Sequence, residues 1–202
     1  VIRIDCDLSE LSNKVHEDEL QYHVHLSDFI SFLADNTQLF SNNTKEWFEV
    51  CSRIRNEITD YDIKEPHIMI RNIQRYFPPF SSVTLDVGQH MLWAAQSLFI
   101  DKDMTLHMSA GLGSMGYALP AAIGVYYAKR KPVVAICGDG GIQMNIQELQ
   151  YISKERLPII VLILNNSALG MIRQFQENNF NKLYVHTTVD SGYSPPDFSK
   201  IA

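Results

Sequence analysis

The sequence predicts an α/β protein in which an open parallel sheet carries helices on both faces. Short apolar strands alternate with helices between residues 82 and 164, and the last of these strands is almost wholly apolar. Strands buried on both faces and separated by helices are typical of parallel sheets with crossover connections. The 202 residues are also enough for the end of a second α/β domain in front of this sheet.

Periodicity and residue type define the elements of this sheet. Runs of apolar or β-branched residues predict its strands at 82–86, 104–109, 132–137 and 158–164. Helical spacing or small helix-forming residues predict its helices at 89–99, after the strand at 104–109 as far as about Lys129, and at 142–155. Ligands of such sheets bind beyond the carboxyl ends of the strands.

The part before residue 82 is predicted to be organised differently. Apolar patterns predict a buried strand and three helices, at 1–5, 26–33, 44–60 and from Pro66 to about 77. The polar stretch 36–43 marks a boundary. We therefore expect a domain remnant at 1–38, a helical linker at 39–65 and a binding domain at 66–202. Both ends are expected to be cut, because the chain opens inside a strand pattern and closes in a starting helix.

Composition narrows the class of protein. The formal net charge of −6, without a Lys or Arg cluster, argues against a nucleic-acid partner. No apolar run reaches membrane-spanning length, so no membrane partner is expected. Cys6, Cys51 and Cys137 show no paired spacing, which indicates reduced thiols and a cytoplasmic protein.

The strongest local motif directly follows the strand at 132–137. Gly138, Gly140 and Gly141 surround Asp139, and glycines bring backbone N–H groups close to a ligand. The next helix directs its N-terminus at the same place, which suits a phosphate group. Because the carboxylate alone would repel phosphate, a bridging Mg²⁺ is expected between them.

A second polar motif ends the following strand. Asn165 and Asn166 come one helix and one strand after Asp139, so the two strand ends lie close together if the strands are neighbours. Asp139 and Asn166 could then both supply oxygen ligands to one octahedral cation, and a backbone carbonyl just after Asn166 is a natural third ligand.

Gly-Asp-Gly followed by Asn-Asn resembles the signature of thiamine-diphosphate enzymes. The segments 86–96, 111–124 and 164–171 resemble acetolactate synthases and occur in that family's order. Residues 1–35 resemble more weakly the end of the family's central domain, and 66–202 its pyrophosphate-binding domain. The resemblance implies thiamine diphosphate and Mg²⁺ as cofactors, and a lyase or transferase that decarboxylates or ligates 2-oxo acids through a C2 ylide.

The resemblance also implies roles for individual residues. Asp139 and Asn166 would bind Mg²⁺ by their side chains and Ala168 by its carbonyl. Met115 would support the bent conformation of the cofactor, which is its catalytic role. The cofactor-binding residues implied are Gln89, His90, Gly113, Met115, Gly138, Asp139, Gly140, Gly141, Asn166, Gly170 and Met171.

One part of the family's site lies outside this sequence. Family members take an activating glutamate from the N-terminal pyrimidine-binding domain of a neighbouring subunit. The resemblance therefore implies a homodimer or homotetramer, and a chain that is inactive alone.

Two departures from the family pattern affect the expectations. Val24 and His25 replace the usual Gly-Asp before the helix at 26–33, which makes FAD a doubtful cofactor. Phe175 stands where acetolactate synthases usually carry a specificity-linked Trp, so the identity of the second substrate does not follow from the resemblance.

Other interpretations of the same residues stay open at this stage. Gly111, Gly113 and Gly116 fit the dinucleotide fingerprint, which would indicate an NAD-dependent dehydrogenase. A non-catalytic paralogue that keeps the fold is a third possibility. Taken singly, Asp139 could be a turn residue and Met115 a core residue.

Overall fold

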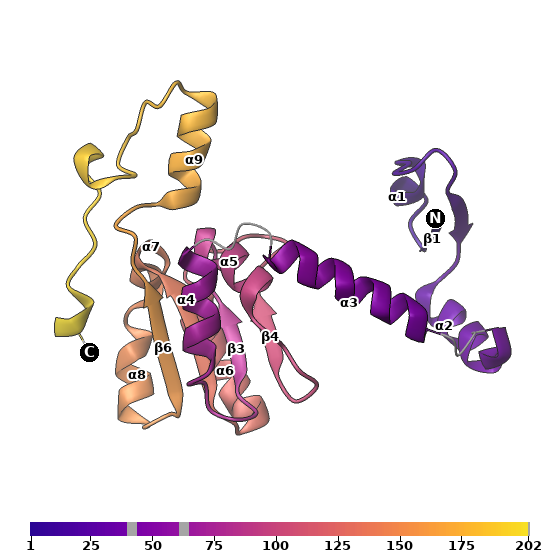
Figure 1. Ribbon diagram of the computed structural model, residues 1–202, viewed down its shortest axis with the longest axis horizontal. Helices are drawn as coiled ribbons and strands as arrows, with labels where there is room; N and C mark the ends of the chain where they lie inside the picture. The colour runs from indigo at the N-terminus through magenta and orange to yellow at the C-terminus, as the bar shows by residue number, and fades with distance from the viewer. Residues whose placement is uncertain (40–43, 61–64, 202) are drawn as a thin grey trace. The chain divides into compact units, whose positions relative to one another are not determined.

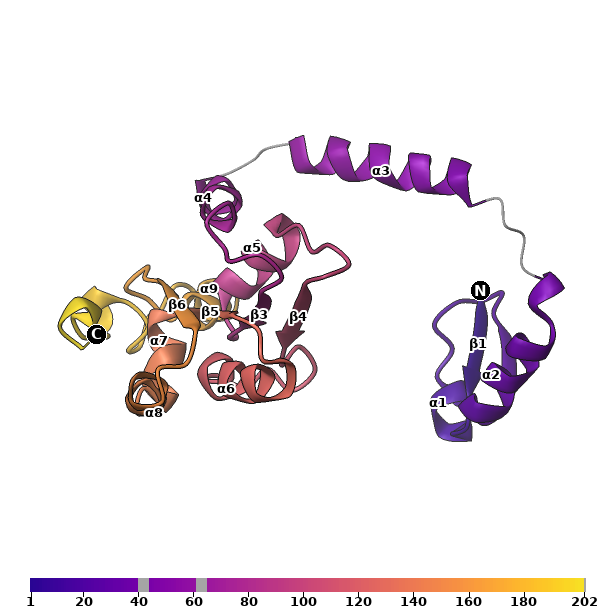
Figure 2. The same ribbon diagram turned by 90° about the horizontal axis from the view of Figure 1, so that it is seen from below.

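A computed structural model describes residues 1–39, 44–60 and 65–201 (Figures 1 and 2). The chain divides into two compact units, Val1–Ile58 and Thr59–Ala202. The predicted boundary at 36–43 and the predicted linker at 39–65 fall partly on residues 40–43 and 61–64, which lie outside the described residues. The three-part division of the chain stays a prediction.

The first unit contains a pair of parallel strands. β1 (Ile2–Asp5) pairs with β2 (Leu20–His23), with Ile2 opposite Leu20. The strand predicted at 1–5 is present, whereas β2 was not predicted, because its four residues mix apolar and polar types and are all exposed. The helices of this unit are α1 (Leu8–Ser12), α2 (Leu26–Asp35), η1 (Thr37–Leu39) and α3 (Lys45–Asp60).

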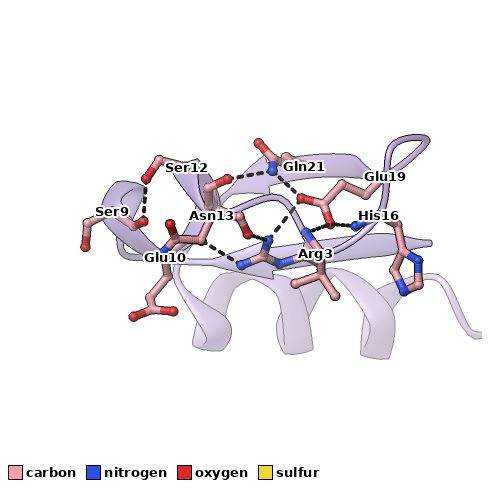
Figure 3. A network of polar contacts seen from close by, with 10 residues as sticks. Arg3, Ser9, Glu10, Ser12, Asn13, His16, Glu19 and Gln21 are labelled. Carbon is pink, nitrogen blue, oxygen red and sulfur yellow. Dashed lines mark hydrogen bonds and ion pairs between the residues drawn. The ribbon is translucent and has the colours of Figure 1, made fainter.

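A buried carboxylate joins the segments of the first unit (Figure 3). The Glu19 side chain accepts hydrogen bonds from Arg3 Nη1 at 3.0 Å, from the Gln21 carboxamide, and from the backbone of Val15 at 3.2 Å and His16 at 3.4 Å. Burial alone raises the pKa of Glu19, but these hydrogen bonds outweigh it and lower the pKa from 4.5 to about 2. The ionised form of Glu19 therefore belongs to the folded state.

The second unit contains the predicted parallel sheet. Its strand order is β4-β3-β5-β6 and every pairing is parallel. The strands are β3 (Ser82–Leu85), β4 (Thr105–Met108), β5 (Val133–Gly138) and β6 (Ile159–Leu164). The helices are α4 (Glu65–Gln74), α5 (Gln89–Ser97), α6 (Ala118–Lys129), α7 (Asp139–Ile142), η2 (Gln143–Asn145), α8 (Glu148–Lys154), α9 (Gly170–Asn179), η3 (Val189–Ser191) and η4 (Phe198–Lys200).

Alternating residues of β5 separate two layers of core. Val133, Ala135 and Cys137 face a cluster formed with α6 and α8, while Val134 and Ile136 face a cluster formed with α4 and α5. All five side chains are fully buried. The helices accordingly lie on opposite faces of the sheet (Figure 2), and the predicted fold class is confirmed.

Two helical predictions need correction. The single helix predicted at 142–155 is divided into α7, η2 and α8. At the break the Asn145 carboxamide donates to the Gly116 carbonyl at 2.8 Å, which ties this segment to the start of α6. The helix expected to start within 196–202 is a single 3-10 turn, η4, and residue 202 lies outside the described residues.

The low pKa of Glu19 predicts an acid-sensitive first unit. Between pH 4.5 and about 2 the unfolded chain takes up a proton at Glu19 that the folded chain does not bind. The free energy of unfolding should therefore fall as the pH decreases through this window, and Glu19→Gln should show a shallower decrease. Denaturant titrations at several pH values measure both slopes, and equal slopes would contradict the assignment.

Candidate functional site

The candidate site lies where the order of the strands reverses. From β3 the chain passes to β4 on one side, and α6 then carries it to β5 on the other side of β3. Loops that leave neighbouring strands in opposite directions open a crevice between them, which is where ligands of such sheets bind. The segments after β3, β5 and β6 all line this crevice.

A cavity of about 240 Å³ occupies this position. Every residue predicted to bind cofactor or metal lines it, including Met115 and Ala168. Phe175 does not: it is 58% exposed on α9 and forms an edge-to-face pair with Phe180, with 5.8 Å between ring centroids. The remaining lining residues are Val87, Gly88, Trp93, Leu164, Leu169 and Ile172.

Two helices begin at the cavity without a side-chain cap. α5 begins at Gln89 and α9 at Gly170, and neither of their N-cap residues, Gly88 and Leu169, makes a side-chain capping bond. The first residues of both helices line the cavity, so the positive ends of two helix dipoles lie at its wall. This arrangement favours an anionic ligand such as a phosphate group.

The glycines after β5 lie in close packing with neighbouring side chains. A Cβ on Gly140 would lie 2.4 Å from Leu169 Cδ2, and one on Gly141 would lie 2.3 Å from Asp86 Oδ2. Neither glycine has a positive φ. The Gly-Asp-Gly-Gly motif therefore lets three neighbouring segments approach the backbone of β5 and α7 closely.

Asp139 begins α7 and is buried, with 2% of its surface exposed. Its Oδ2 accepts a hydrogen bond of 2.9 Å from the Tyr193 hydroxyl, and its backbone carbonyl accepts one of 2.9 Å from Gln143 Nε2. Burial and the adjacent Asp139 raise the pKa of Tyr193 well above its ordinary value, so this hydroxyl stays a donor.

Asn166 lies in a tight turn after β6. Its Oδ1 accepts from Ala168 N at 3.1 Å, and its Nδ2 lies 3.5 Å from Gln89 Oε1. Ser167, between Asn166 and Ala168, has a left-handed φ of 53°. β5 and β6 are neighbours, with Gly138 opposite Leu164, so the predicted strand adjacency is confirmed. Asp139 and Asn166 consequently follow adjacent strand ends.

The oxygen donors at these strand ends fit a hard divalent cation. They comprise the Asp139 carboxylate, the Asn166 carboxamide and the Ala168 carbonyl, all on residues that line the cavity. Within the described parts of the chain no group of three or more His, Cys, Asp or Glu side chains could hold a metal. A set with one acid, two neutral oxygens and no sulfur or imidazole suits Mg²⁺ better than Zn²⁺.

His90 lines the same cavity and contains a buried ring nitrogen. The residue is 5% exposed, and its Nε2 has no hydrogen-bond partner among the described residues. The ring fills the space beside Gly88 and Gly138, where a Cβ would come within 2.8 and 2.9 Å of it. Burial lowers the pKa of His90 to about 4, although a hydrogen bond with the Asp86 backbone acts in the opposite direction. An unpaired buried nitrogen beside a cavity is compatible with a ligand-binding position.

Comparison with known proteins places this site in a family. Residues 86–202 match the family model for the thiamine pyrophosphate enzymes, C-terminal TPP binding domain. The chain belongs to this family. Its relatives are of the acetolactate synthase type, so the family predicted from the sequence is confirmed.

Three relatives illustrate the similarity. The acetolactate synthase isozyme 2 large subunit of Escherichia coli (strain K12) is 36% identical, over 100% of this chain and 36% of that protein. The acetolactate synthase large subunit of Buchnera aphidicola subsp. Acyrthosiphon pisum is 38% identical, over 86% and 29%. That of Cyanidium caldarium is 34% identical, over 100% and 36%. The chain thus spans about a third of the length of these relatives.

Two residues of this thiamine pyrophosphate enzyme domain, the buried Asp86 and the half-buried Tyr193, were missed as individual site residues. Asp86, fully buried after β3, accepts hydrogen bonds from Val87 N at 2.8 Å, Gly116 N at 2.8 Å and Tyr117 N at 3.2 Å. Burial raises its pKa, while these three bonds act to lower it. An acid directly after a buried strand was the available signal. Tyr193 has no comparable local signal, because its partner Asp139 lies 54 residues away.

The described helices show no candidate for a membrane span: each is too short or too polar to cross a bilayer. The three cysteines are unpaired thiols, with Cys137 buried and Cys6 and Cys51 exposed.

The buried ring of His90 predicts an unusual titration. An NMR titration should show a midpoint near pH 4 for His90, below the ordinary 6.5. Between these pH values the unfolded chain binds a proton that the folded chain excludes, so stability should fall as the pH drops through this window. His90→Gln should remove the signal and flatten the pH dependence. A midpoint close to 6.5 would show that the ring is solvated.

Proposed function

We propose that the cavity binds thiamine diphosphate through Mg²⁺, and that the chain forms part of an acetolactate-synthase-like enzyme that acts on 2-oxo acids. The observation that carries this proposal is the position of Asp139 and Asn166 at adjacent strand ends, beside two uncapped helix N-termini. Family membership of residues 86–202 supports the same cofactor.

The proposed metal ligands are the Asp139 carboxylate, the Asn166 carboxamide oxygen and the Ala168 carbonyl. The cation would offset the repulsion between Asp139 and a diphosphate. Around it, the backbone donors of Gly140, Gly141, Gly170 and Met171 and the side chains of Gln89 and His90 would receive the phosphate oxygens. These diphosphate-binding groups rely on N–H donors and one metal ion rather than on Lys or Arg side chains. This agrees with a chain whose net charge is −6.

Met115 is proposed to pack against the bound cofactor and to support its bent conformation. It lines the cavity next to Gly113, and its Cε lies 3.5 Å from where a Cβ on Gly140 would be. Bound thiamine diphosphate would supply a nucleophilic carbon and a sink for the electrons released on decarboxylation. The residues of this chain would orient it and exclude water.

Activation of the cofactor is proposed to need a glutamate from the N-terminal domain of a neighbouring subunit, in a homodimer or homotetramer in the cytoplasm. This fits a chain that spans about a third of the length of its relatives. Phe175 is proposed to influence the choice of second substrate. FAD remains a doubtful cofactor.

The structure weakens the case for a dinucleotide site at Gly111–x–Gly113–x–x–Gly116. Such a site needs free N–H groups in the glycine-rich turn before the helix, but the N–H groups of Gly116 and Tyr117, directly before α6, already donate to the Asp86 carboxylate. A Cβ on Gly111 would meet no atom within 4 Å, so nothing described requires glycine there. The other interpretation, a non-catalytic paralogue, differs in its turnover: such a protein would bind the cofactor without converting a substrate.

Removal of the metal carboxylate tests the proposed site. Titration calorimetry on the full-length protein should show Mg²⁺-dependent binding of thiamine diphosphate. Asp139→Ala should weaken this binding on the order of 100-fold or more, about 2.7 kcal/mol, because the diphosphate loses its bridging cation. The control Asp103→Ala changes an exposed acid of the same unit and should bind like the wild type. Equal binding by Asp139→Ala would refute the metal assignment.

The shared site predicts that this chain alone does not turn over pyruvate. With thiamine diphosphate and Mg²⁺ present, neither acetolactate nor acetaldehyde should form above the uncatalysed rate, whereas the full-length protein should be active on a 2-oxo acid. Product assays on both proteins at equal concentration check this. Substantial turnover by the chain alone would contradict a site that needs a second domain.

A further inference from the structure

The segment 185–193 lies against the turn that carries Asn166 and Ala168. Leu169 N donates to the Thr187 carbonyl at 2.9 Å, and Ala168 forms an antiparallel bridge with Thr188. Thr187 is 2% exposed and its hydroxyl donates to Gln176 Oε1 of α9 at 2.7 Å. The segment is therefore fixed to both the metal turn and the helix that follows it.

The segment is also rigid within itself. Ser191 Oγ accepts from the backbone N–H groups of Thr187 at 3.0 Å and Thr188 at 2.9 Å. Gly192 follows with a left-handed φ of 99°, where a Cβ would lie 2.8 Å from the His186 ring. Tyr193 N then donates to the Thr188 carbonyl at 2.9 Å. These bonds determine the direction in which the Tyr193 side chain leaves the segment.

The Tyr193 side chain reaches the other half of the site. Its hydroxyl donates to Asp139 Oδ2 at 2.9 Å and accepts from Gln143 Nε2 at 3.3 Å. Among the residues that the structure describes, no donor is bonded to Asp139 Oδ1. One short segment thus contacts both ligand-bearing loops: Ala168 through the backbone bridge and Asp139 through a side chain.

We infer that Tyr193 is a positioning residue for the metal, and that the segment 185–193 holds the two ligand-bearing loops in the arrangement that binds it. This inference rests on the proposed function. A buried carboxylate that is held by one hydrogen bond needs no reordering when a cation binds, so the hydroxyl increases metal affinity without touching the metal. Such outer partners of metal ligands typically change affinity by 10–100-fold.

Tyr193→Phe tests this inference, because it removes the hydroxyl and keeps the ring. Calorimetric titration of Mg²⁺ into the full-length protein with thiamine diphosphate should show affinity reduced by about 10–100-fold. The melting temperature without metal or cofactor should stay within about 4 °C of the wild type. At saturating Mg²⁺ the affinity for thiamine diphosphate should return to the wild-type value, a rescue that a purely structural defect would not allow.

Two further variants sharpen the result. Ser191→Ala loosens the segment without touching Asp139, and it should lower Mg²⁺ affinity in the same direction. Tyr76→Phe is the matched control, since Tyr76 is 84% exposed and remote in sequence from the segment; it should bind Mg²⁺ like the wild type.

The outcomes separate this inference from the proposed function. Wild-type Mg²⁺ affinity in Tyr193→Phe, together with loss of binding in Asp139→Ala, would overturn the positioning role alone. Absence of Mg²⁺-dependent thiamine diphosphate binding in the wild type would overturn both. Reduced affinity in Tyr193→Phe that excess Mg²⁺ does not rescue would assign Tyr193 a structural role and also overturn the inference.

Discussion

The parallel pairing of β5 with β3 on one side and β6 on the other is the constraint on which the site depends. It places Leu85 opposite Ile136, and Gly138 opposite Leu164. The polar residues that follow these strands therefore meet at one edge of the sheet. β5 is the central strand of this arrangement, and its side chains from Val133 to Cys137 are fully buried on both faces of the sheet.

Backbone donors, rather than cationic side chains, dominate this edge. The N-termini of α5 and α9 have no side-chain cap, whereas the N–H groups of Gly116 and Tyr117, directly before α6, are bound by Asp86. Asp86 thus has a structural function: it holds the segment that follows Met115 against the end of β3. Within the described part of the chain, Asp86 Oδ2 and His90 Nε2 are buried without hydrogen-bond partners, which costs free energy unless a ligand compensates.

The site also extends beyond its local motifs. The segment 185–193 is far in sequence from the Gly-Asp-Gly-Gly loop, yet Tyr193 contacts Asp139 and the backbone of the same segment contacts Ala168 and Leu169. The segment 185–193 thus joins the loop that follows β5 to the loop that follows β6. Family membership does not by itself reveal such a connection, because it depends on how one turn of this chain packs.

Much of this protein could be predicted from its sequence. Apolar strands alternating with helices determined the parallel sheet, and Gly-Asp-Gly-Gly and Asn-Asn at two strand ends predicted which residues would share a cavity. Such features are local, because residue type and spacing act within one strand, helix or turn. Only the tertiary structure decided that β5 lies between β3 and β6, that Asp86 binds the start of α6, that the helix after Asp139 is broken, and that Tyr193 reaches Asp139. Each of these depends on contacts between segments far apart in the chain, which no local pattern encodes.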